Sequence, residues 1–150
     1  MRTTAVYGTA MVVLVTAVNL LHGVFHVGQE VLSLQPWQWA YVTCVIFLAP
    51  VVATLLLWSP YRLVGAWLLF GSMAGSFVFD LAYHFLIEGP DNVFTLEPGA
   101  WLMPFRLSAV LLVAMSGLGA LVGGWAVLTL SRLQARTPSG SHVAVEKGRR

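Results

Sequence analysis

Four long apolar segments constrain what this chain can fold into. They cover about residues 5–32, 37–58, 61–87 and 104–133. Each is long enough to cross the roughly 30 Å hydrocarbon core of a bilayer as a helix, and helices satisfy their own backbone hydrogen bonds in lipid. Only 9% of the residues are charged, against roughly 25% in soluble domains. We therefore predict an all-α integral membrane protein with four transmembrane helices in an up-down bundle.

Turn-forming residues separate the apolar segments. "SPYR" at 59–62 predicts a tight turn, and "EGPDNVFTLEPGAW" at 88–101 predicts an external loop. Pro50 should kink the second segment, whereas Pro104 suits the first turn of the fourth. Residues 1–133 then form one transmembrane domain, and the polar residues 134–150 form a disordered cytoplasmic tail.

The basic residues predict the orientation. Arg106 alone is expected at one end of the bundle, and the others fall at the opposite end: Arg2, Arg62, Arg132, Arg136, Lys147, Arg149 and Arg150. The positive-inside rule places both termini in the cytoplasm. We expect a multi-pass protein surrounded by lipid, in the plasma membrane of a prokaryote. The basic residues form no pattern that would follow a phosphate backbone, so nucleic acid is not expected as a partner.

Ionisable side chains recur at intervals of four in two of the segments. The six residues are His22, His26 and Glu30 in the first segment and Asp80, His84 and Glu88 in the third. Residues four apart share one face of a helix. The first and third helices run in the same direction, so the two stripes should lie at the same depth near the outer membrane face. Because burying such groups in hydrocarbon is costly, the stripes should face each other.

These residue types favour a divalent metal site. Imidazole and carboxylate groups bind Zn²⁺, Mn²⁺ and non-haem iron, and imidazole also binds copper. The predicted ligands are His22, His26, Asp80 and His84. Glu30 and Glu88 would lie nearer the surface, as outer partners of the ligands, as a second site or as a charged funnel. In a membrane metalloenzyme they would be the candidate general bases.

Three other functions are compatible with the same pattern. A b-type haem would be held between His84 and His22 or His26. A transporter or proton relay would use Asp80 and the histidines as intramembrane proton or ion groups. A structural or assembly subunit of a membrane complex would use both stripes as a polar network between helices. The sequence specifies no reaction and no substrate.

Two GxxxG pairs predict close packing of the third and fourth helices, or of two copies of the chain or other membrane partners. They are Gly71 with Gly75 and Gly119 with Gly123. A lone thiol, Cys44, is expected to be a small buried residue and forms no intramolecular disulfide.

Two features at the outer end have a less defined role. Arg106 should pair there with an acid such as Glu88 or Glu30. The loop string "GPDNV" at 89–93 would allow Asp91 to fold back over the stripes.

Overall fold

The computed structural model describes residues 2–31 and 34–136, and the regular elements within these ranges are all helical. The elements are α1 (Arg2–Gly28), α2 (Pro36–Tyr41), the π-helical η1 (Val42–Leu48), α3 (Ala49–Leu57), α4 (Arg62–Leu81), the π-helical η2 (Ala82–Leu86) and α5 (Leu102–Ala135). They form four long helical segments, each of which crosses the bundle once and is called a crossing of the bundle below. All four are long and apolar enough to span a membrane: Arg2–Gly28, Pro36–Leu57, Arg62–Leu86 and Leu102–Ala135. The prediction of four such helices is confirmed. Most of the predicted tail lies outside the described residues.

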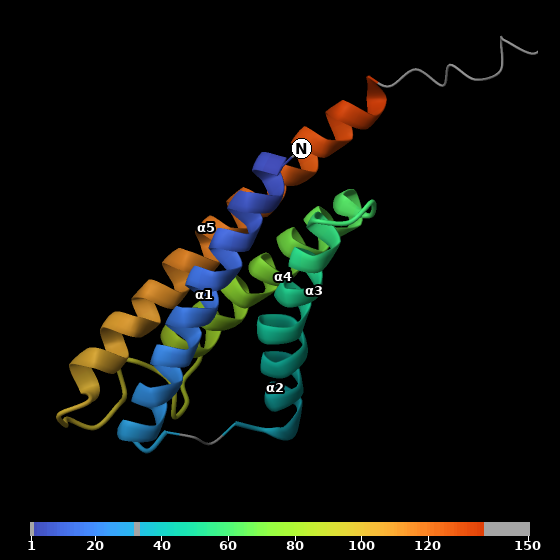
Figure 1. The fold of residues 1–150 in the computed structure, drawn as a ribbon. Coiled ribbons are helices and arrows are strands. Elements are labelled where there is room, and N and C mark those ends of the chain that lie inside the picture. Colours follow the sequence, from blue (N-terminus) through green and yellow to red (C-terminus); the bar gives the residue numbers. More distant parts are fainter. Residues whose placement is uncertain (1, 32–33, 137–150) are drawn as a thin grey trace, which may run out of the picture.

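Successive crossings run antiparallel, and α5 lies beside both α1 and α4 (Figure 1). Apolar packing closes the end of the bundle at the N-terminus of α1. Its core takes residues from every crossing: Ala5, Val12, Val15, Ala53, Leu57, Ala66, Leu69, Met73, Ala126, Val127 and Leu130. Alanine and glycine let the helix backbones approach closely there.

Glycines of α5 form the tightest contact between α4 and α5. A Cβ added at Gly123 would lie 2.7 Å from Cα and N of Phe70, and one at Gly119 would lie 2.8 Å from Sδ of Met73. The third and fourth crossings therefore pack through this glycine pair. The other predicted pair does not join them. Gly75 faces Tyr41, and no atom in residues 2–31 and 34–136 lies within 4 Å of the Cβ position of Gly71.

At the opposite end of the bundle α2 and η1 lean away from α1 (Figure 1). Within η1 the hydrogen bonds span five residues, and Ala49 N–H donates to the carbonyl oxygen of Cys44. Pro50, which has no N–H, then occupies the first turn of α3. Ile46 is the one buried residue of η1. Cys44 is exposed, against its expected burial, because it lies on the outward face of this helix.

The 87–101 connection covers the end of the bundle between η2 and α5. Val93 of this loop packs with Phe105 and Ala109 of α5 in a second apolar core. The side chain of Asn92 accepts a hydrogen bond from Phe94 N–H and donates one to the carbonyl oxygen of Ile87. The loop is therefore ordered by its own side chains, as its turn-forming residues suggest.

Arg106 ties the loop to α5. Its Nε donates to the carbonyl oxygen of Val93 at 2.7 Å. The expected partner was a carboxylate. The loop carbonyl takes its place because the loop folds over the first turn of α5.

Two adjacent glycines of α5 test this packing. We expect Gly123→Ala to destabilise the protein by about 1–3 kcal/mol, because the new methyl group meets the backbone of Phe70. Gly124→Ala is the matched control, since its Cβ would lie 3.6 Å from the Phe70 ring. It should be neutral or stabilising by up to about 1 kcal/mol, through helix propensity. Unfolding midpoints of the purified proteins in detergent measure both effects, and equal midpoints for the two variants would contradict the packing.

Candidate metal centre

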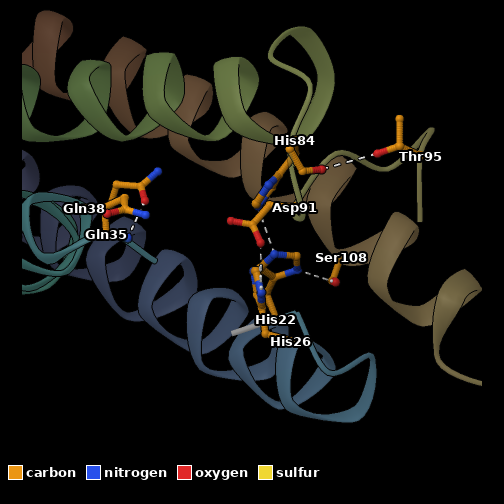
Figure 2. Close-up of polar contacts among 9 residues, drawn as sticks. His22, His26, Gln35, Gln38, His84, Asp91, Thr95 and Ser108 are labelled. Carbon is orange, nitrogen blue, oxygen red and sulfur yellow. Dashed lines mark hydrogen bonds and ion pairs between the residues drawn. The ribbon is translucent and has the colours of Figure 1, made fainter. Parts of the chain in front are cut away.

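Three histidines meet at the loop end of the bundle (Figure 2). His22 and His26 lie one turn apart on α1, and His84 lies on η2. Each histidine contributes one ring nitrogen, and these three nitrogens lie within 4.8 Å of one another. His22 and His84 are each only 4% exposed. The structure thus brings three of the four predicted ligands into one cluster.

Ser108 of α5 sets the orientation of the His22 ring. The Ser108 hydroxyl donates to the carbonyl oxygen of Phe105 at 2.9 Å, so it accepts from Nδ1 of His22, which lies 2.7 Å away. A proton on Nδ1 leaves Nε2 of His22 as a hydrogen-bond acceptor. It accepts from Nε2–H of His84, which lies 2.9 Å away. The acceptor nitrogen of His22 therefore points into the cluster, where a metal ion would replace the shared proton.

Phe105 packs against all three imidazoles. Its ring centroid lies 4.7 Å from that of His22, 4.9 Å from that of His26 and 5.9 Å from that of His84. Phe105 and Ser108 lie three residues apart on one face of α5. Sequence reasoning missed both, because neither is an ionisable residue and their spacing is common among core residues.

Asp91 approaches the cluster from the loop, where its carboxylate Oδ1 lies 3.7 Å from Nδ1 of His26 (Figure 2). These two atoms and Nδ1 of His84 are buried and have no hydrogen-bond partner among residues 2–31 and 34–136. Burial raises the pKa of the Asp91 carboxyl to about 6. Buried polar atoms nearly always have partners, so three such atoms at one place favour a site that takes up a ligand.

Asp80 is buried but is not a member of the close histidine group. Its Oδ2 accepts a hydrogen bond of 2.9 Å from the Ser116 hydroxyl of α5. The helix changes to π geometry just after this residue, and Ile87 N–H donates to the carbonyl oxygen of Ala82, five residues earlier. A helix with this wider turn does not keep residues four apart on one line. Asp80 and His84 therefore do not form the straight stripe that their interval of four predicts.

Glu30 lies beyond the end of α1, where it caps the helix. Its φ is 59°, and its N–H donates to the carbonyl oxygen of Val27. Val31 N–H donates to the carbonyl oxygen of His26, which completes a Schellman cap. Because the left-handed residue ends the helical periodicity, Glu30 is exposed and does not continue the line of His22 and His26.

Glu88 lies beyond the end of η2. Ile87 before it has extended backbone angles, so the interval of four from His84 is not helical here. Glu88 is exposed. It lines a small polar cavity of about 180 Å³ together with Gln35, Gln38 and Asp91.

A second cavity, of about 200 Å³, adjoins the histidines between α1, η1 and α4. Its polar residues are Asn19, His22, His26, Asp80, His84 and Asp91, and most of the remaining lining is apolar. Asp91 lines both cavities. The carboxylate therefore lies between a polar cavity at the loop surface and an apolar one within the bundle.

The cluster has dimensions close to those of a three-nitrogen metal site. Zinc binds histidine at about 2.0–2.1 Å, so two ligands of a tetrahedral ion lie about 3.3 Å apart. The cluster has nitrogens at 2.9 Å and at separations up to 4.8 Å. Side-chain rotations that move nitrogens by about 1 Å would give this spacing, and the Ser108 contact matches the usual outer partner of a ligating histidine.

Comparisons with known proteins give no family assignment. The chain matches no protein-family model, no curated protein and no solved structure. The candidate site therefore rests on its own geometry.

Proposed function

We propose that this chain is an integral membrane protein that binds a divalent transition metal through His22, His26 and His84. The observation that carries the proposal is the meeting of three ring nitrogens within 4.8 Å of one another, beside buried polar atoms that have no partner in the part of the chain that the structure describes. Neutral imidazole suits zinc, copper and iron. Asp80 is a further candidate ligand, because it faces the same cavity from one turn earlier on α4.

The outer surface of the bundle supports a position within a bilayer. Large apolar side chains are exposed on every crossing, for example Leu14, Leu55, Val78 and Leu121. An apolar surface of this extent is expected against lipid rather than water. The basic residues at the end opposite the histidines favour cytoplasmic termini. The metal site would then lie near the outer face of the membrane.

Three protein nitrogens leave a coordination position for water or a substrate, which is the arrangement of catalytic zinc sites. A bound metal would supply Lewis-acid chemistry at that position. In this chain Asp91 is better placed to accept a proton than the exposed Glu30 or Glu88, because its carboxylate already lies beside His26. Glu88 lines the polar cavity that leads to Asp91 and is suited to attract cations from the outer surface.

A haem receives less support than a metal ion. The cavity beside the histidines measures about 200 Å³, whereas pockets for drug-sized ligands start at roughly 300 Å³, and a porphyrin needs at least that space. Phe105 also packs directly on the rings that would be its axial ligands. A purely structural polar network remains the main competitor, and metal analysis separates it from the proposal.

Metal content tests the proposed site. Protein purified without chelators and loaded with Zn²⁺ or Co²⁺ should bind about one ion per chain, and a His22→Ala, His84→Ala double variant should lose it because two of three nitrogens are gone. His142→Ala is the control, since this histidine lies outside the described residues and the proposed ligand set. Elemental analysis and the visible spectrum of bound Co²⁺ provide the measurements. Folded wild-type protein that binds no ion, or a double variant that keeps it, would refute the proposal.

Ser108 should tune metal affinity without being a ligand. Ser108→Ala removes the acceptor for Nδ1 of His22, and the loss of such a partner typically weakens metal binding by roughly 10–100-fold. Ser72→Ala is the matched control, because Ser72 is also buried and donates to a carbonyl oxygen three residues earlier in its own helix. Competition titrations against a chromophoric chelator give both dissociation constants. The same constant for both variants would argue against the Ser108 contact.

A further inference from the structure

The lining of the cavity beside the histidines combines two kinds of side chain. Its polar end holds the clustered imidazoles with Asp91. The rest of the lining includes Asp80 and apolar side chains such as Leu20, Val42, Ile46, Phe47 and Phe79. Binding sites for small molecules commonly combine an apolar wall with a few convergent polar groups.

The rim of the cavity is apolar and exposed. Leu20 of α1 is 60% exposed and Trp39 of α2 is 50% exposed, and both line the cavity. Trp39 belongs to α2, which leans away from α1 (Figure 1). In a bilayer this rim would face hydrocarbon, so molecules dissolved in lipid would reach the cavity from the side.

The polar end is rich in hydrogen-bond acceptors. Oδ1 of Asp91 has no donor among the described residues. The donor on Nδ1 of His22 is already used by Ser108. A ligand that carries an O–H group would satisfy the free acceptor.

We propose that this cavity binds a neutral, lipid-soluble alcohol or phenol, with its hydroxyl group at the histidine cluster and its apolar part between α1 and η1. The volume of about 200 Å³ is sufficient for one substituted ring, since apolar cavities of roughly 150 Å³ bind benzene. The inference rests on the proposed function for the chemistry that would follow binding, because a metal at the three histidines would lie beside the hydroxyl group.

Gly23 provides a way to fill the cavity. It lines the cavity on α1, and a Cβ added there has no atom of the described residues within 4 Å. Gly23→Phe would therefore occupy ligand space without displacing the histidines. Val42→Phe fills the same space from η1. Gly71→Phe is the matched control, because its Cβ position on α4 is equally open and Gly71 does not line the cavity.

The experiment measures saturable binding of tritiated 4-propylphenol and propylbenzene to the full chain in lipid nanodiscs, with empty nanodiscs as the partition blank. Wild-type protein and Gly71→Phe should bind 4-propylphenol. Gly23→Phe and Val42→Phe should bind it at least about tenfold more weakly. Propylbenzene should also bind wild-type protein at least about tenfold more weakly, because it cannot donate to the free acceptor.

Metal content is measured on the same samples to separate the two proposals. Saturable phenol binding without bound metal would refute the metal site and support the cavity. Metal retained in both cavity-filling variants, together with undiminished phenol binding, would overturn the cavity proposal alone. Equal binding of propylbenzene and 4-propylphenol would overturn it as well, because the polar end would then contribute nothing to recognition.

Discussion

The arrangement of this protein depends on burying three imidazoles side by side in an apolar bundle. Each ring has two nitrogens that need partners, and within hydrocarbon an unsatisfied polar group is costly. Ser108 satisfies one nitrogen of His22, and Phe105 packs against all three rings. Both residues come from α5, so the position of α5 beside α1 and α4 determines how the rings lie. A metal ion bound among these rings would replace the direct contact between Nε2 of His22 and Nε2 of His84.

One end of the bundle is filled by an apolar core, and the other end contains a cavity. At the N-terminal end of α1, alanines and glycines let all four crossings meet in one apolar core. At the other end α2 and η1 lean away, and the space beside the histidines forms the cavity. Both π-helical segments border this region, one carrying Ile46 and the other His84. Such segments often occur at functional sites, where they depart from regular α-helical register.

Asp91 connects the loop to the proposed chemistry. It lines the polar cavity near the loop surface and the apolar cavity inside the bundle, and its carboxylate lies beside His26. An ion from water and an apolar molecule from lipid would thus reach the histidines by different routes. The short loop keeps Asp91 at this position because Asn92 and Val93 fix it. Asn92 donates to the carbonyl oxygen of Ile87, and Val93 donates its N–H to the carbonyl oxygen of His84 on η2 and packs against α5.

The sequence by itself determined the four apolar helices and the shared face of His22 and His26, because both follow from segment composition and from the periodicity of one helix. It also indicated that His84 would join them, since parallel helices bring corresponding depths together. Local helix ends and tertiary contacts decided the remaining details of the site. Glu30 and Glu88 fall beyond helix ends, where local caps and extended backbone replace the interval of four. The sequence indicated that Asp91 would fold back over the cluster from its loop, where its carboxylate contacts His26. Ser108 and Phe105 reach the cluster through contacts between elements far apart in the chain, which no local periodicity encodes.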